Sequence, residues 1–391
     1  MSDPVVRIAA RGDGVTASGR HVPFGVPGDS VQADGTLEPG PHHQVPPCRH
    51  FPECGGCQLQ HADDDAYRGY LVTRVATALA QHDLSTEILE PHLSPSRSRR
   101  RATLRALKVG NGAALGFNAE KSHRIIDMRE CHILRPELFA LVAPLRRLFA
   151  TLLEPRRTAE VQMTLIDGGI DLLLKGVSAE GLQRIEALND FALANQLARL
   201  SIDQGLGPET LFEPRPATVT LSGRPVAFPV GAFLQATQDG ETALAGSVSE
   251  AVSGSKSVAD LFAGLGTFAL VTNATYAAEA SRDAAAALKR ASPGLAVEHR
   301  DLYRRPLTPD ELARFDSVIL DPPRAGAEEQ VRALAASTVQ GIAYVSCNPG
   351  TFARDARMLV DGGYRLQWVR PVGQFRWSTH VELAARFSGR G

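Results

Sequence analysis

Apolar and polar residues follow a regular order over the last third of the chain. Short apolar runs with the length of buried strands lie at 258–262, 274–278, 295–297, 317–320 and 342–346. Stretches with helical periodicity lie at 282–291, 328–337 and 352–361. Strands that alternate with helices predict a parallel sheet covered on both faces. Two further strands, 364–369 and 381–387, follow without a helix between them, so we predict a closing antiparallel hairpin.

The rest of the pattern predicts two other domains. Residues 4–47 alternate short apolar stretches with Gly and Pro, which is typical of a small all-β unit. A cysteine-rich loop and a helix at 64–82 follow, and then a mixture of helices (136–153) and strands (168–174). We therefore predict a small N-terminal β-barrel over 1–47, an α+β middle domain over 48–230 and an α/β domain over 231–391.

Composition narrows the class of protein. The 391 residues are 43% hydrophobic and 22% charged, as in soluble globular proteins. A net charge of -1 excludes a basic coat, so any nucleic-acid contact needs a local patch, such as the Arg and Lys run over 97–108. No apolar segment has the length of a membrane span or the pattern of a signal peptide, which predicts a cytoplasmic protein. No obligate protein partner follows from the sequence.

A turn after the first strand of the α/β domain predicts a nucleotide-type cofactor. The strand runs into Gly264-Leu265-Gly266-Thr267, although tight strand-to-helix packing alone explains many such turns. Glu279 ends the second strand, where a carboxylate can accept both hydroxyls of a ribose. Asp301 follows the third strand, where it is placed to meet an adenine edge. Ala269 replaces the third glycine of a pyrophosphate loop, so S-adenosylmethionine fits better than a dinucleotide.

The fourth and fifth strands end in candidate reactive groups. Asp321-Pro322-Pro323-Arg324 lies at the carboxyl edge of the sheet, where ligands bind; alternatively, the prolines merely stop the strand. Cys347 follows the fifth strand and precedes a helix, whose N-terminal partial charge is expected to lower the pKa of the thiol. The alternative is a buried structural cysteine.

Five motifs together resemble the RNA 5-methyluridine (uracil-C5) methyltransferase family. They lie in the family's order at 233–235, 260–267, 321–324, 345–349 with 353–355, and 380–382. The resemblance implies a class I S-adenosylmethionine-dependent methyltransferase domain, with Cys347 as nucleophile and Glu382 as general base. It also implies that the cofactor is surrounded by Gln235, Phe262, Gly264, Gly266, Thr267, Glu279, Asp301 and Asp321.

The chemistry of this family explains why these groups are needed. Carbon 5 of uracil is weakly nucleophilic, so a thiolate first adds at carbon 6 and converts the ring to an enolate. After methyl transfer, a base removes the carbon-5 proton. His380 and Glu382 are expected to alternate onto one face of a strand, so either can serve, and the resemblance favours Glu382; a solvated carboxylate is the alternative.

The target base must leave its stack to react. Phe233, Asp321 and Arg324 are the candidate contacts to the flipped base. The chain departs from the family pattern at Thr237, at Thr267 and over 375–379, where F-P-x-T is expected. Because residues 375–379 directly precede His380 and Glu382, this departure leaves the position of the Glu382 side chain undetermined by the family pattern.

Four of the five cysteines form a second candidate site. Cys48, Cys54 and Cys57 have the spacing C-x5-C-x2-C, and Cys131 is the remaining cysteine apart from Cys347. Thiolates suit zinc or an iron-sulfur cluster, and the spacing does not choose between them. His50, His61 and His132 add possible zinc ligands, and free thiols are a further alternative.

The resemblance of residues 48–61 to the iron-sulfur loop of the ribosomal-RNA branch implies a 4Fe-4S cluster with Cys131 as fourth ligand. Residues 4–47 likewise resemble a shortened TRAM domain. The sequence thus predicts S-adenosylmethionine-dependent methylation of carbon 5 of a uridine, in 23S rRNA rather than tRNA. A catalytically silent iron-sulfur RNA-binding protein and an exocyclic-amine methyltransferase are the alternatives; Arg324, where the latter class has an aromatic residue, disfavours it.

Overall fold

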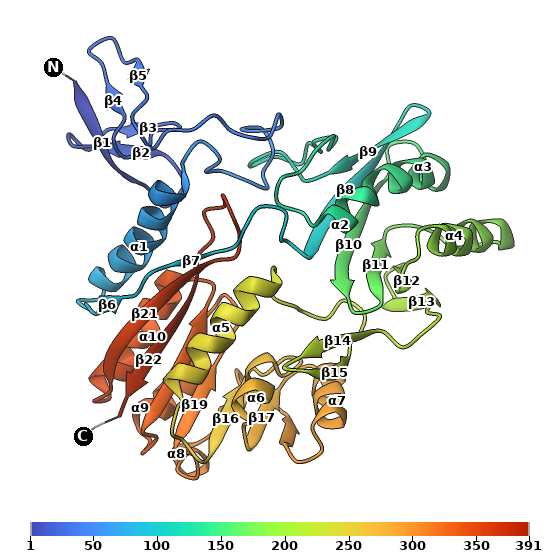
Figure 1. The fold of residues 1–391 in the computed structure, drawn as a ribbon. Coiled ribbons are helices and arrows are strands. Elements are labelled where there is room, and N and C mark those ends of the chain that lie inside the picture. The colour runs from blue at the N-terminus through green and yellow to red at the C-terminus, as the bar shows by residue number, and fades with distance from the viewer. Residues whose placement is uncertain (1, 390–391) are drawn as a thin grey trace. The chain divides into compact units, whose positions relative to one another are not determined.

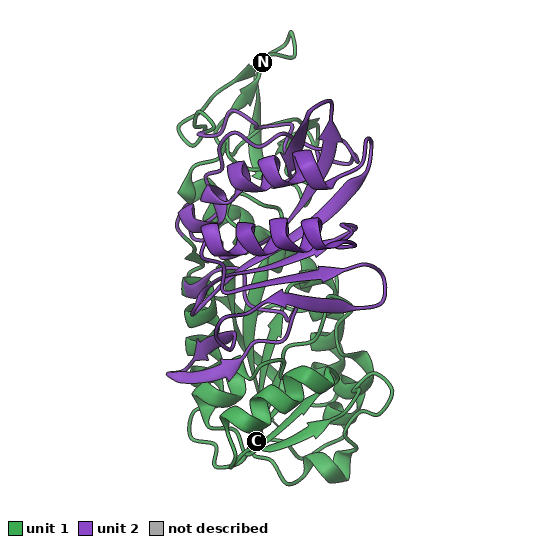
Figure 2. Cartoon of the chain, turned by 90° about the vertical axis from the view of Figure 1, so that its right-hand side faces the viewer, with its two compact units in different colours: residues 1–46, 59–94, 239–391 green, residues 47–58, 95–238 purple. Residues whose placement is uncertain are grey.

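The computed structural model describes residues 2–389, and the chain divides into two compact units (Figure 2). Unit 1 comprises residues 1–46, 59–94 and 239–391, and unit 2 comprises residues 47–58 and 95–238. Each unit is described by itself below. No helix within residues 2–389 combines the length and the apolar character needed to cross a membrane.

The main sheet of unit 1 confirms the predicted α/β arrangement. Its strands follow the order β18-β17-β16-β19-β20-β22-β21-β6, and β7 also pairs with β21 (Figure 1). The first five strands of this order are parallel, and β22 is antiparallel to both of its neighbours. The strands are β6 (Glu87–Ile88), β7 (His92–Leu93), β16 (Val258–Leu261), β17 (Tyr276–Glu279), β18 (Ala296–His299), β19 (Ser317–Leu320), β20 (Gly341–Ser346), β21 (Arg365–Gly373) and β22 (Glu382–Ser388).

Helices cover both faces of this sheet because its central strands are apolar on both sides. Leu261, Leu320 and Tyr344 belong to one large core cluster with apolar residues of α1, α9 and α10. The helices α5, α6 and α7 lie on the opposite face (Figure 1). The helices of unit 1 are α1 (Asp64–Ala80), α5 (Gln238–Ala251), α6 (Thr267–Thr272), α7 (Arg282–Ala291), α8 (Pro309–Leu312), α9 (Glu328–Ala335) and α10 (Pro349–Asp361).

The N-terminal segment forms the predicted all-β unit. Five antiparallel strands follow the order β3-β2-β1-β4-β5, so β3 and β5 are its edges. Val5, Ile8 and Val26 supply buried apolar side chains. The strands are β1 (Asp3–Ile8), β2 (Gly14–Thr16), β3 (His21–Val22), β4 (Ser30–Val31) and β5 (Leu37–Glu38).

Unit 2 is built on a six-stranded sheet with the order β13-β12-β11-β10-β8-β9 and a separate β14-β15 hairpin. The single helix expected over 136–153 is two helices, because Pro144 has no N–H to donate to the carbonyl of Ala140. The elements are β8 (Arg101–Val109), β9 (Gly112–Gly116), α2 (Pro136–Ala140), α3 (Val142–Leu152), β10 (Thr158–Ile166), β11 (Gly169–Lys175), α4 (Leu182–Ala194), β12 (Arg199–Asp203), β13 (Pro208–Phe212), β14 (Thr218–Leu221) and β15 (Arg224–Ala227).

The division into units differs from the three predicted domains. Residues 59–94 were expected in the middle domain, yet β6 and β7 pair with β21 of the C-terminal sheet. His92 Nε2 also lies 2.8 Å from Asp239 Oδ2 at the start of α5. Strand pairing with a segment almost 300 residues away leaves no local sequence signal, so the return of residues 59–94 to unit 1 could not be read from the sequence.

Candidate active site

The turn after β16 has the backbone geometry that a close ligand approach requires. Phe262 adopts φ +65°, an unusual conformation for a residue with a side chain, and Gly264 and Gly266 adopt φ +54° and +91°. A Cβ on Gly266 would lie 2.3 Å from Leu288 Cδ1 of α7, so only glycine permits this packing. Thr267 then begins α6.

Glu279 lies beside this turn. Its Oε2 accepts a 2.8 Å hydrogen bond from the Gly264 N–H, and its Oε1 accepts a 2.6 Å bond from the Ser281 N–H. The turn and the end of β17 are thereby tied together. A ribose approaching the turn would meet this carboxylate first.

Two more carboxyl groups, those of Asp260 and Asp321, lie near this turn. Asp260 is fully buried. Burial raises the pKa of Asp260, the negative charges of Asp321 and Glu279 raise it further, and the Ala269 N–H opposes the rise. A cationic ligand bound at the turn would favour the deprotonated forms of these carboxyl groups.

Tyr303 closes the other side of this turn and was not found by sequence reasoning. Its ring centroid is 5.6 Å from that of Phe262, and its hydroxyl donates a 2.9 Å hydrogen bond to the Gly326 carbonyl. Asp301 precedes it, and Asp301 Oδ1 accepts from the Tyr303 N–H at 3.0 Å. The signal available in the sequence was an aromatic residue, Tyr303, two positions after Asp301.

Strand pairing brings Cys347 and Glu382 close together. The antiparallel ladder of β20 and β22 ends at the pair Ser346 and Leu383, and Cys347 and Glu382 are the next residues beyond that pair. The charge of Glu382 raises the pKa of the Cys347 thiol, as expected for neighbouring groups. Asn348 caps α10 by accepting from the Gly350 N–H at 3.1 Å, and Pro349 occupies the first helical turn. The predicted closing hairpin therefore creates the thiol-carboxyl pair.

The titration of these groups differs from the expectation for Cys347. Burial raises the pKa of the Cys347 thiol to about 11, and the charges of Glu382 and Asp321 add to the rise while Arg324 opposes it. Burial likewise raises the pKa of Glu382 to about 8, with Asp321 adding, and that of Asp321 to about 7. The predicted lowering by the helix N-terminus was wrong, because burial and two carboxyl groups outweigh it.

The segment before Glu382 departs from the family pattern and has its own anchors. Tyr67 of α1 donates from its hydroxyl to the Phe375 carbonyl at 3.1 Å, and Tyr70 donates to the Thr379 carbonyl at 3.1 Å. Strand β22 begins at Glu382, so His380 lies outside the strand and is exposed. The expected alternation of His380 and Glu382 along one strand was wrong.

Two predicted ligand-binding residues fall in unit 2. Arg100 Nε donates to the Gln235 carbonyl at 3.2 Å, and the Arg101 guanidinium lies 4.6 Å from the centroid of the Phe233 ring, which is 59% exposed. Arg100 is buried, so the predicted basic patch is partly used for internal contacts. The cofactor role of Gln235 and the base-stacking role of Phe233 stay predictions.

The four cluster cysteines also lie together in unit 2. The backbone of Cys54 forms an isolated antiparallel β-bridge with Ala119. The Arg49 guanidinium, next to Cys48, lies 3.3 Å from the carboxylate of Glu130, which precedes Cys131. Burial raises the pKa of Cys48 to about 11, and the charges of Glu130, Cys131 and Cys54 add to it. The four cysteines named in the sequence analysis thus lie in the same unit, and Cys54 and Cys131 are near enough to Cys48 to raise the pKa of its thiol.

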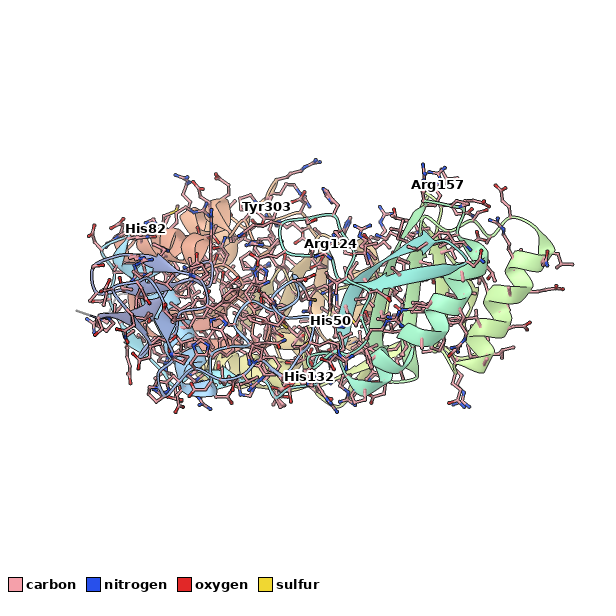
Figure 3. The ribbon with its side chains drawn as sticks, turned by 90° about the horizontal axis from the view of Figure 1, so that it is seen from above. His50, His82, Arg124, His132, Arg157 and Tyr303 are labelled. Atoms are coloured by element: carbon pink, nitrogen blue, oxygen red, sulfur yellow. The ribbon has the colours of Figure 1, made fainter. Side chains whose placement is uncertain are left out.

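The candidate histidine ligands are placed differently. His50 Nε2 accepts a 2.9 Å hydrogen bond from the Arg129 N–H, so that nitrogen already has a partner (Figure 3). His132 Nε2 lies 3.9 Å from Glu130, and His61 belongs to unit 1.

Comparison with known proteins shows the family of the chain. A sequence model of the tRNA (uracil-5-)-methyltransferase family matches residues 296–387. An RNA methyltransferase of Zymomonas mobilis is 51% identical over 98% of this chain and 99% of its own length. The 23S rRNA (uracil(1939)-C(5))-methyltransferase RlmD of Chromohalobacter salexigens is 32% identical over 91% of this chain and 79% of its own length.

A solved structure has the same fold. The tRNA (uracil-54, C5)-methyltransferase of Pyrococcus abyssi, in complex with S-adenosyl-L-homocysteine, superposes with a TM-score of 0.77 over 99% of both chains at 22% identity. The sheet of unit 1 is therefore that of a class I methyltransferase. The chain belongs to the RNA uracil-C5 methyltransferase family.

Proposed function

We propose that the protein transfers a methyl group from S-adenosylmethionine to carbon 5 of a uridine in 23S rRNA. The observation that carries the proposal is the proximity of Cys347, which directly follows β20, and Glu382, which begins the paired strand β22. A thiol and a base close to each other are the two groups that addition and proton removal require.

The residues around the glycine turn fit the cofactor. Glu279 is placed for ribose hydroxyls, and the buried Asp260 carboxyl group interacts electrostatically with Glu279 and Asp321. When bound, S-adenosylmethionine supplies a methyl group on a positively charged sulfur. The carboxyl groups around Phe262 complement that charge.

The chain's own residues carry the remaining steps. After the Cys347 thiol has lost its proton to solvent, the thiolate sulfur forms a bond to carbon 6 of the uracil, and the electron pair of the 5,6 double bond moves into the ring carbonyl as an enolate. Once carbon 5 bears the methyl group, Glu382 takes its proton. The electron pair left behind restores the double bond and expels the Cys347 thiolate.

The choice of RNA rests on relatives and on unit 2. The relative named as a 23S rRNA enzyme shares 32% identity over most of the chain, whereas the tRNA enzyme of known structure shares the fold at 22%. In unit 2, a hollow beside the cysteine loop is lined by groups that contact unpaired nucleotides: an aromatic ring, an amide and cations, from Phe117, Asn118, Arg105 and Lys121.

We further propose a 4Fe-4S cluster bound by Cys48, Cys54, Cys57 and Cys131. The proposal is supported by the position of all four cysteines in unit 2 and by the resemblance of residues 48–61 to the iron-sulfur loop of the ribosomal-RNA branch. The role of the cluster here would be to hold the cysteine loop against residue 131.

The test uses RNA transcripts that contain 5-fluorouridine. Because fluorine at carbon 5 cannot leave as a proton, the enzyme and RNA should remain covalently joined after methyl transfer. A band resistant to denaturing electrophoresis, dependent on S-adenosylmethionine and lost in Cys347→Ala, is the expected result. A 23S rRNA fragment should react faster than tRNA. Failure of wild-type protein to form the adduct or 5-methyluridine with any cellular RNA would refute the proposal.

A further inference from the structure

We propose that Asp355 is a positioning residue for the reaction, holding the segment that carries Asp321 and Arg324 at a fixed place relative to Cys347. The segment, called the Asp321 loop below, comprises residues 321–327. The inference rests on the proposed function, since it assigns a role in the same site. Asp355 lies on α10, away from the reacting groups, and acts through backbone and side-chain bonds.

The Asp355 carboxylate is fully buried and binds three elements at once. Its Oδ2 accepts hydrogen bonds from the Tyr344 hydroxyl at 2.6 Å and from the Ala327 N–H at 2.8 Å. Its Oδ1 accepts from Arg354 Nε at 2.9 Å and Nη2 at 2.7 Å. Tyr344 is in β20 just before Cys347, and Ala327 ends the Asp321 loop.

The same helix holds the middle of the Asp321 loop. The Arg324 carbonyl accepts from Asn348 Nδ2 at 3.1 Å and from Thr351 Oγ1 at 3.3 Å. Arg354 Nη2 donates to the Ala325 carbonyl at 3.2 Å. The loop that presents Asp321 and Arg324 is thus tied to α10, which begins directly after Cys347.

Gly326 gives an independent sign of this close approach. It adopts φ +82°, and a Cβ at this position would lie 2.6 Å from Asp355 Oδ2. The loop therefore follows a path that only glycine permits, directly over the carboxylate. Tyr303 adds a bond from the cofactor side, because its hydroxyl donates to the Gly326 carbonyl at 2.9 Å.

The negative charge of Asp355 is essential to this arrangement. Its three partner residues supply four donor groups to two oxygens, so a neutral amide of the same size would turn an N–H toward another donor. Asn at 355 should therefore release at least one partner while leaving the packing volume unchanged. The Asp321 loop would then lose its fixed distance from the Cys347 sulfur, and misplacement by about 1 Å is enough to cost about 100-fold in rate.

The experiment compares Asp355→Asn and Tyr344→Phe with a control, Glu311→Gln. Glu311 also accepts two bonds from an arginine of unit 1, Arg300, at 2.8 and 2.9 Å, but it takes no part in the site. We expect kcat for RNA methylation to fall about 30-fold in Asp355→Asn and less in Tyr344→Phe, with the Kd for S-adenosylhomocysteine within about threefold of wild type. The control should keep wild-type kcat.

A second measurement needs no RNA. The rate of Cys347 alkylation by iodoacetamide, followed by peptide mass spectrometry across pH 6 to 10, reports on the groups around the sulfur. The profile should shift in Asp355→Asn and stay unchanged in Glu311→Gln. If Asp355→Asn does not fold, Tyr344→Phe provides the same test, because it removes one bond and no charge.

The outcomes separate this inference from the proposed function. Wild-type kcat and an unchanged alkylation profile in both folded variants would overturn the role of Asp355. Equal losses of kcat in Asp355→Asn and Glu311→Gln would also overturn it, because general destabilisation would explain them. If wild-type protein methylates no RNA, the proposed function fails, while the alkylation profiles still decide whether Asp355 sets the surroundings of Cys347.

Discussion

Burial of charge governs the reacting residues of unit 1. Cys347, Glu382 and Asp321 lie close enough for each carboxyl group to raise the pKa of the thiol, and burial raises all three pKa values. In this state the thiol is protonated at neutral pH and the two carboxyl groups titrate near pH 7 to 8. A bound cation would favour the deprotonated forms, so cofactor binding and thiol activation are linked.

Replacing Glu382 with Gln should stabilise the protein at high pH. The pKa of Glu382 is about 8 in the folded chain against an ordinary value of 4.5, so the folded state binds the extra proton between these values. Stability is therefore lost as pH rises through this window, by an amount on the order of a few kcal/mol above pH 8. The melting temperature of Glu382→Gln should match wild type near pH 4 and exceed it at pH 9. A lower melting temperature at pH 9 would contradict the raised pKa.

The same variant should separate methyl transfer from product release. With Gln at 382, Cys347 can still add to the base and carbon 5 can still receive the methyl group, but its proton has no acceptor. A covalent adduct that contains one labelled methyl group should accumulate on unmodified RNA. Detection by denaturing electrophoresis with radiolabelled cofactor checks this. Turnover at the wild-type rate would mean that another group, such as His380, removes the proton.

The candidate reacting residues could be selected from the sequence, whereas the direction of their pKa shifts could not. Cys347 and Glu382 are identified by motifs at strand ends, because local spacing fixes where a strand or helix begins. Their pKa values depend on burial and on charges brought together by strand pairing. The N-terminal dipole of α10 is a local feature, and the tertiary environment of Cys347 outweighs it.

At the scale of elements, regular periodicity predicted regular structure. Six of the seven strands over 258–387 and the helices expected at 282–291 and 328–337 agree with the structure to within about two residues. The helix expected at 352–361 begins earlier, at Pro349, and β21 continues beyond its predicted end to Gly373. Elements made by long-range pairing were missed, such as β6 and β7, which are two residues each. The Asp321 loop was found as a motif, but its bonds to α10 were not, since Asp355 and Ala327 meet only in the folded chain.

Substitutions of Tyr303 test whether its ring, which lies beside Phe262 in the turn after β16, contributes to cofactor binding. Tyr303→Ala removes the ring beside Phe262 as well as the bond to Gly326, and the Kd for S-adenosylhomocysteine should rise about tenfold. Tyr303→Phe is the matched control, because it keeps the ring and loses only the hydroxyl; its Kd should stay within about threefold. Isothermal titration calorimetry provides both values. Equal affinity in the two variants would show that the ring does not contribute to cofactor binding.

At the scale of the whole molecule, the two units divide the chemistry between them. Unit 1 holds the glycine turn, Cys347 and Glu382, and unit 2 holds the four cluster cysteines together with Phe233 and Gln235. The chain enters unit 2 at residue 47, returns to unit 1 at 59 and enters unit 2 again at 95. The cysteine loop belongs to unit 2, whereas the glycine turn proposed to bind the cofactor belongs to unit 1. We therefore expect that loss of order in the cysteine loop leaves the glycine turn intact.

Replacing Cys131 with Ser tests two proposals together: that the four cysteines bind an iron-sulfur cluster, and that loss of this cluster leaves cofactor binding in unit 1 unchanged. Anaerobically purified wild-type protein should be brown and contain about four irons and four sulfides per chain, because four thiolates suit one cubane. Cys131→Ser should lose the colour and weaken RNA binding by about tenfold, since unit 2 loses the link between residues 48–57 and residue 131. The Kd for S-adenosylhomocysteine should not change, because the residues proposed here to bind it in unit 1 are untouched. Cys347→Ser is the control, and it should keep the colour and lose methylation. A colourless wild-type preparation with stoichiometric zinc would refute the iron-sulfur cluster. It would not affect the proposed role of Cys347, which the covalent complex with 5-fluorouridine RNA tests separately.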